Sequence, residues 1–233
     1  MRSVLTLAVL AAVGSAAVAE DLKDIILPAR YGVAPAPEFY PQGTPKEALA
    51  TAAKLLEKQR YAYLLAHLVD PAVVDAQVAA RVRQLTPAVE KRLADIRADQ
   101  KRSLRPETRP EDVIPLDPTG FAERVQAEAE KQAFTDLVKA MQDHLAEFPE
   151  NVAQLAAVSR DGAIAESGTA ATAEAKDVPN KKVLLKQISV QALKESRVLV
   201  DGKPGTRRDP ITVPRWFVED RQTADAEKPK ADK

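Results

Sequence analysis

Residues 44–71 read TPKEALATAAKLLEKQRYAYLLAHLVDP, and this stretch carries the clearest structural signals in the chain. Thr44 is suited to be a helix N-cap, and Pro45 suits the first helical position because it has no N–H to leave unpaired. Glu47 completes a capping box with Thr44. Apolar residues then recur at helical spacing on both sides of a polar interruption. The stretch therefore predicts a helix, a break near residues 58–60 and a second, shorter helix.

The same start signal occurs three more times along the chain. Asp70, Thr86 and Asp117 each precede a proline, and each side chain can accept a hydrogen bond from the first turn of a helix. We therefore expect three further helices to begin at these positions. The last of them is the longest and ends near Phe148, before Pro149. Residues 103–120 hold four prolines and many charges, which predicts a loop.

The pattern changes after Asn151. Asp161-Gly162 lies between two short apolar runs, which predicts a β-hairpin. VPNKKVLLKQIS (178–189) is typical of a strand, and SRVLVDGKPGTRRDPITV (196–213) predicts a strand, a long polar loop and the start of another strand. RWFVEDR (215–221) then closes the sheet. Helices followed by antiparallel strands predict an α+β domain with its helices packed on one face of a sheet.

The two ends of the chain differ from the middle. Arg2, an apolar run and the small residues Ala17-Val18-Ala19 match a signal peptide cleaved after Ala19. We therefore expect an exported protein, periplasmic or secreted, with no stable membrane anchor after cleavage; an uncleaved anchor is the alternative. Residues 20–43 are proline-rich and predict an extended leader laid against the domain. Residues 222–233 are polar and charged, which predicts a disordered tail.

Composition excludes several classes of protein. The chain has no cysteine, so it has no disulfides, no cysteine-linked lipid anchor, no thiol nucleophile and no thiolate metal site. Lys+Arg and Asp+Glu both number 34, so no strong field draws the protein to nucleic acid. Aromatic residues make up only 4%, which predicts a core built mostly of Ala, Leu and Val.

One family resembles this order of elements. Residues 44–75 are similar to the opening of nuclear transport factor 2-like (SnoaL-like) domains, which begin with a capped helix, a break and a second helix ending near an acidic residue. KKVLLKQI followed by RWFVEDR resembles their last two strands, where a tryptophan before an apolar pair is common. The resemblance covers residues 44–221 and implies a curved antiparallel sheet that encloses a cone with its helices. Two segments depart from it: a helical insertion at 86–120, and 189–213, which separates the last two strands.

The resemblance also directs attention to five residues as a candidate pocket: Tyr61, Tyr63, His67, His144 and Trp216. Enzymes that resemble this fold place an acid or a histidine and a tyrosine inside the cone for proton abstraction. Both histidines lie near predicted helix ends, where the dipole favours a protonated imidazole. Trp216 either lines the cone or plugs it.

The catalytic alternatives have less support from the sequence. Asp70 precedes a proline, so N-capping explains it. No phosphate-binding, dinucleotide-binding, serine-hydrolase or paired-histidine motif occurs, so we expect no cofactor and no metal.

Three hypotheses follow from the sequence. The first is a non-enzymatic exported binding or accessory domain whose cone or sheet face binds a small apolar ligand or another envelope protein. Such sheets often dimerise face to face, so the resemblance also implies a homodimer. The second hypothesis is a small acid–base enzyme, of isomerase or dehydratase type, that uses the cone. The third is a structural protein of the cell envelope.

Overall fold

The structure is a computed structural model, and it describes residues 25–36, 42–102, 114–115, 117–175, 182–200 and 203–219. The predicted signal peptide and the predicted C-terminal tail lie outside the described residues. Among the described residues, no helix combines the length and apolar character that a membrane span needs.

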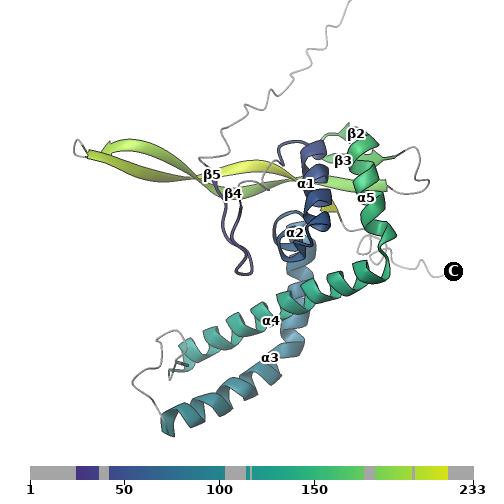
Figure 1. Ribbon diagram of the computed structural model, residues 1–233. Coiled ribbons are helices and arrows are strands. Elements are labelled where there is room, and N and C mark those ends of the chain that lie inside the picture. The colour runs from purple at the N-terminus through teal and green to yellow at the C-terminus, as the bar shows by residue number, and fades with distance from the viewer. Residues whose placement is uncertain are drawn as a thin grey trace, which may run out of the picture.

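Within the described residues, five helices precede most of an antiparallel sheet, which confirms the mixed α+β class (Figure 1). The helices are α1 (Pro45–Glu57), α2 (Tyr61–His67), α3 (Pro71–Arg102), α4 (Pro118–Glu147) and α5 (Glu150–Asp161). The strands are β1 (Ile25–Ile26), β2 (Ala163–Ser167), β3 (Ala170–Glu174), β4 (Lys182–Val200) and β5 (Lys203–Glu219).

The capping signals are confirmed at three of the four predicted helix starts. Thr44 and Glu47 form the complete capping box of α1. The Ala72 N–H donates to Asp70 Oδ1 at 2.9 Å at the start of α3. The Gly120 N–H donates to Asp117 Oδ2 at 2.6 Å at the start of α4. Each side chain satisfies an N–H that the helix cannot pair internally.

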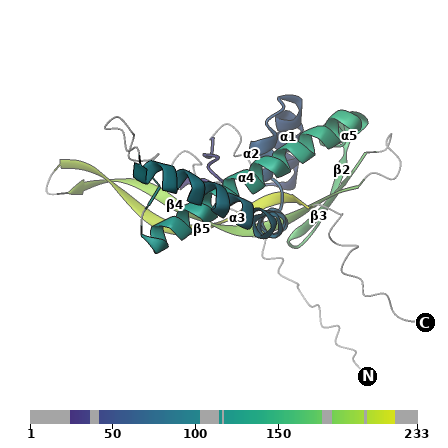
Figure 2. The same ribbon diagram turned by 90° about the horizontal axis from the view of Figure 1, so that it is seen from below.

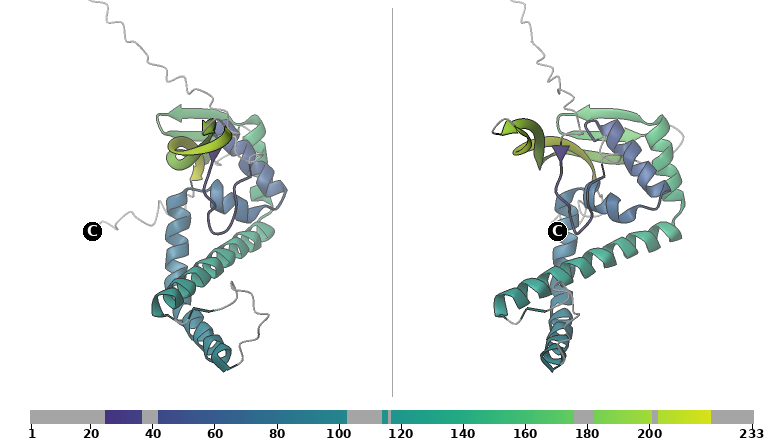
Figure 3. Two further views of the ribbon diagram at one scale, coloured as in Figure 1. Left: turned by 90° about the vertical axis from the view of Figure 1, so that its left-hand side faces the viewer. Right: turned by 60° about the vertical axis from the view of Figure 1, so that its left-hand side comes forward.

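The predicted helix start at Thr86-Pro87 is wrong, because α3 continues through it. Thr86 does not cap; its Oγ1 donates to the Val82 carbonyl at 2.8 Å, one turn back. Val82 and Val89 on either side of Pro87 are both buried in one apolar cluster with α4. Packing along this shared face outweighs the cost of a proline in a helix, and the helix bends instead of ending (Figure 3).

Helices α3 and α4 form a long hairpin that extends away from the sheet (Figure 1), so that in the view from below they lie across β4 and β5 (Figure 2). Its core is made mostly of Val and Ala, as the scarcity of aromatic residues predicted. Phe134 is buried within it and stacks on Tyr31, with ring centroids 4.7 Å apart. Two residues that the helical periodicity places on the apolar faces are exposed instead: Ile96 at 47% and Phe148 at 38%.

The hairpin predicted around Asp161-Gly162 is wrong, because these residues end helix α5. A Cβ at Gly162 would lie 2.2 Å from the Val158 carbonyl oxygen, so only glycine fits this close approach. The hairpin turn lies six residues later, between β2 and β3, where Ser167 pairs with Ala170. Gly168 in that turn has φ +61°, a conformation that glycine adopts without strain.

The long polar loop predicted within residues 189–213 is also wrong. Strands β4 and β5 pair continuously from Leu184↔Glu219 to Val200↔Lys203 and form a twisted hairpin that projects beyond the helices (Figure 1). The prolines of β5 do not interrupt it, because β5 is an edge strand of the described sheet: β4 is its only partner strand there, and Val218 makes an isolated bridge to Val69.

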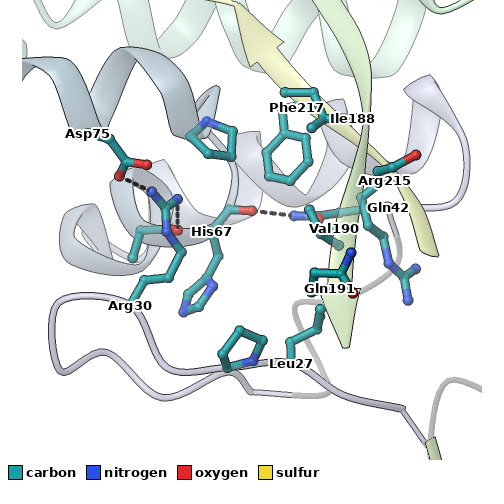
Figure 4. A pocket seen from close by; sticks show the side chains of 14 residues that line it. Leu27, Arg30, Gln42, His67, Asp75, Ile188, Val190, Gln191, Arg215 and Phe217 are labelled. Carbon is teal, nitrogen blue, oxygen red and sulfur yellow. Dashed lines mark hydrogen bonds and ion pairs between the residues drawn. The ribbon is translucent and has the colours of Figure 1, made fainter. Parts of the chain in front are cut away.

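Strand β4 is the centre of the sheet. Strand β5 covers one edge of β4, while β3 and the short β1 pair with different parts of the other edge. The predicted leader therefore contributes a strand, and its remaining described part, up to Ala36, folds back under the hairpin toward α2 (Figure 4). This arrangement leaves a hollow beneath the middle of β4.

Candidate functional site

A pocket of about 260 Å³ lies between the leader segment 25–36, helix α2, the start of α3 and the β4–β5 hairpin (Figure 4). Its lining combines apolar and polar side chains from four parts of the chain: Leu27, Pro28, Arg30, Gln42, Ala66, His67, Pro71, Asp75, Ile188, Ser189, Val190, Gln191, Arg215 and Phe217. The site is therefore created by the tertiary structure and not by any one segment.

The apolar wall follows from strand register. Ile188 pairs with Arg215, and the neighbouring ladder pairs place Val190 and Phe217 on the same face of the hairpin. Phe217 and Arg215 are each 4% exposed. Leu27, which directly follows β1, closes the wall from the opposite side. This part of the pocket can accommodate an apolar group.

Gln42 connects the two sides of the pocket. Its main-chain carbonyl accepts a hydrogen bond from the Trp216 N–H at 3.0 Å, on the outer edge of β5. Its side-chain Nε2 donates to the carbonyl of His67 at 3.0 Å, at the end of α2 (Figure 4). Gln42 is 1% exposed, and these bonds fix its position in the pocket lining.

A polar cluster ties the leader segment to α3. Arg30 Nη1 donates to the Ala66 carbonyl at 2.8 Å, while Nη2 donates to the carboxylate of Asp75. The Tyr31 hydroxyl donates to the same carboxylate. Burial, together with this hydrogen bond to Asp75, raises the pKa of Tyr31 well above its ordinary value, so the phenol stays protonated. With its two donors in place, Asp75 holds the leader in position.

His67 lies beside the pocket in a neutral form. Its Nε2 is 3.0 Å from the carbonyl of Val33, and because a carbonyl only accepts, Nε2 carries the proton. Burial lowers the pKa of His67, and the nearby charge of Arg30 lowers it further, although the hydrogen bond to Val33 opposes both effects. Desolvation thus outweighs the helix-end effect that the sequence suggested, and the imidazole is uncharged near pH 7.

The structure separates the five residues that the resemblance brought together. Of these, His67 alone lines the pocket. The Tyr63 ring centroid is 4.8 Å from that of His67, but the Tyr63 hydroxyl turns to the leader, where it accepts from the Ala36 N–H at 3.0 Å. Tyr61 lies beside Tyr63 at a different surface hollow.

His144 and Trp216 lie elsewhere in the fold. His144, near the end of α4, borders an apolar hollow of about 400 Å³ between the helices and the end of β5. Trp216 is 3% exposed and belongs to a core cluster with Leu49, Val158 and Leu185. Trp216 therefore fills the space between the sheet and helices α1 and α5.

Arg30, Gln42 and Arg215 are site residues that sequence reasoning did not find. Arg30 and Gln42 belong to the predicted leader, where no periodic pattern marks a position as buried. Arg215 lies next to Trp216. Successive side chains of a strand point to opposite faces, and this alternation is the signal that places Arg215 and Trp216 on different faces. Prolines and charges in residues 203–215 obscured that alternation.

Within the described residues, no group of three or more His, Cys, Asp or Glu side chains is placed to hold a metal ion. No protein-family model, curated protein or solved structure matches the chain. The pocket is thus the principal source of functional information. Its arrangement favours binding, because its carboxylate is held by Arg30 and Tyr31 and its imidazole is bonded to the main chain.

Proposed function

We propose that this protein is an exported, non-enzymatic binding or accessory domain of nuclear transport factor 2-like type. In this proposal the pocket under the β4–β5 hairpin serves as the binding cone, and its ligand is small and mainly apolar. A homodimer formed through the sheet belongs to the same proposal.

The observation that carries the proposal is the make-up of the pocket. Binding sites are concave and mostly apolar, with a few fixed polar groups that orient the ligand. Here Leu27, Val190 and Phe217 supply the apolar surface. Gln42 and His67 supply polar groups whose positions are set by hydrogen bonds to the main chain. A cavity of about 260 Å³ suits a ligand of a few carbon atoms or one side chain of a larger partner.

An acid–base enzyme is a second candidate, favoured by one observation. The lowered pKa of His67 keeps its imidazole neutral near pH 7, as a general base requires. If this candidate is correct, a substrate must reach the imidazole. Substitution of His67 would then abolish turnover while leaving binding of an inert apolar probe intact.

The test is a titration of the ¹⁵N-labelled protein with small alcohols and carboxylic acids of four to eight carbons, followed by NMR. We expect shifts confined to the pocket, and we expect Val190→Phe to abolish them because the larger ring fills the cavity. Val183→Phe is the matched control: it makes the same change on β4, but Val183 packs with the Trp216 cluster instead of the pocket. Equal binding by both variants, or shifts centred elsewhere, would overturn the proposal.

A further inference from the structure

One part of the β4 edge has no strand beside it within the described residues. β3 pairs with β4 up to Lys186, and the Gln187 N–H donates to the Thr169 carbonyl at 2.7 Å. Pairing on this edge resumes at Leu193, which faces Ile26 of β1. From Gln187 to Leu193 is six residue steps, or about 20 Å of strand. The gap is long enough for a short extended segment.

The direction of the backbone groups in this gap follows from strand alternation. Gln187 points its N–H away from β5, toward β3. Because successive residues of a strand alternate, Ser189 and Gln191 point their N–H and C=O groups to the same side. No described residue pairs with the backbone of these two residues on that side. They present two donors and two acceptors at the spacing of an antiparallel strand.

This bare edge coincides with the pocket. Ile188, Ser189, Val190 and Gln191 all line it, four consecutive residues of one strand. An antiparallel segment would exchange two hydrogen bonds with Ser189 and two with Gln191. Its middle residue would then face Val190, and directly opposed residues place their side chains on the same face of a sheet. That face is the apolar wall of the pocket.

We propose that the ligand of the pocket is an extended peptide segment of a partner protein, which adds to β4 as an antiparallel strand and inserts one apolar side chain. This inference rests on the proposed binding function and names its ligand class. Main-chain bonds give such complexes affinity, and the pocket selects the side chain. The peptide would run in the direction of β1 and β3, which flank the gap and are both antiparallel to β4.

The opposite edge of the hairpin supports this assignment. Trp216 and Val218 point their N–H groups outward from β5, to the carbonyls of Gln42 and Leu68. By alternation, Pro204, Pro210 and Pro214 occupy outward positions of the same edge, where they offer no N–H. Prolines and covering segments are the usual protection of edge strands against added strands. Residues 188–192 of β4 contain no proline, and no described segment pairs with the outward backbone groups of Ser189 or Gln191, so the described residues give this edge neither form of protection.

The experiment measures binding of the blocked peptide acetyl-Ser-Thr-Leu-Thr-Ser-amide to the full chain by ¹⁵N NMR. Two N-methylated peptides separate the main-chain contribution. Methylation of the threonine nitrogens removes the donors that face Ser189 and Gln191, whereas methylation of the leucine nitrogen alters an N–H that points away. We expect the first change to weaken binding about tenfold or more and the second to have little effect.

Protein variants provide the reciprocal test. Gln191→Pro removes an outward N–H of β4 and should weaken peptide binding about tenfold, the expected size for lost main-chain hydrogen bonds. Gln191→Ala controls for the side chain. Thr212→Pro controls for proline, since Thr212 faces Gln191 across the hairpin and its N–H points to the far edge. Gln191→Pro should bind the peptide about tenfold more weakly than Gln191→Ala, which lacks the same side chain, and Thr212→Pro should bind like the unmodified protein; if Gln191→Pro fails to fold, the N-methylated peptides decide alone.

A small probe distinguishes the two proposals. The alcohol 3-methylbutanol mimics the leucine side chain without any peptide group, so the pocket should bind it in both the unmodified protein and Gln191→Pro. If the alcohol binds but the peptide binds no more tightly, or if both N-methylated peptides bind equally, strand addition is overturned while the pocket remains a binding site. If neither the alcohol nor the peptide binds, the proposed function itself fails.

Discussion

Trp216 provides the most direct test of how the core of this protein is built. It is the only tryptophan, it is 3% exposed, and it packs against Leu49 of α1, Val158 of α5 and Leu185 of β4. We predict that Trp216→Ala strongly destabilises the protein, because it removes a large buried ring and leaves a cavity among these side chains. A weak effect would place Trp216 at the wall of an open cavity instead.

The magnitude follows from the buried surface. A tryptophan side chain buries about 150–250 Å², which at about 25 cal/mol per Å² is about 4–6 kcal/mol. Alanine retains part of this area, so the expected loss is about 3–5 kcal/mol, in the range typical of tryptophan-to-alanine changes in cores. Since domains are stable by about 5–15 kcal/mol, the variant should be marginal at room temperature.

Urea denaturation followed by circular dichroism measures this loss without depending on tryptophan fluorescence. Ile96→Ala is the control: it also truncates a large apolar side chain, but Ile96 is 47% exposed, so its effect should stay within about 0.5 kcal/mol. A loss below about 1 kcal/mol for Trp216→Ala would refute the assignment of Trp216 to the core. In the unmodified protein, the tryptophan fluorescence should also resist quenching by iodide.

Two further predictions concern single residues. Burial lowers the pKa of His67 below its ordinary value of 6.5, so the unfolded chain binds a proton more readily than the folded chain, and stability should fall as the pH is lowered below about 6.5. His67→Gln keeps a donor for the Val33 carbonyl but does not titrate. Urea denaturation at about pH 7.5 and about pH 5.5 should therefore show a smaller fall in the free energy of unfolding for this variant than for the unmodified protein. Equal falls in the two proteins would contradict the burial argument. Pro87→Ala restores an N–H that can donate to the carbonyl of Arg83 and should stabilise α3, by up to about 3 kcal/mol. Thermal denaturation measures this gain, and a decrease would show that packing on α4 requires the bend.

Local signals in the sequence were sufficient where one residue and its near neighbours decide the outcome. Thr44, Asp70 and Asp117 each start a helix, because an N-cap needs only a side-chain oxygen within reach of the first turn. The sequence also predicted the break after Glu57 and a last strand that contains Trp216. The order of helices and strands was enough to establish the α+β class.

Tertiary contacts decided the positions where two local signals compete. Thr86-Pro87 has the same start signal as the other three, yet α3 continues because Val82 and Val89 both bury against α4. Asp161-Gly162 resembles a hairpin turn but ends a helix, since Val158 of that helix is buried against the sheet. Residues 203–215 contain turn-forming residues, yet they form a strand because β4 pairs along their whole length.

The sequence by itself determined the helix starts at Thr44, Asp70 and Asp117, the α+β class and the absence of thiol chemistry, because each depends on composition or on residues a few positions apart. Only the tertiary structure decided the pocket, since Arg30, His67 and Phe217 come from distant segments and meet only when the leader folds under the hairpin (Figure 4). It also decided the role of Trp216: alternation places Trp216 and Phe217 on opposite faces of β5, and only packing shows which face is core and which is pocket.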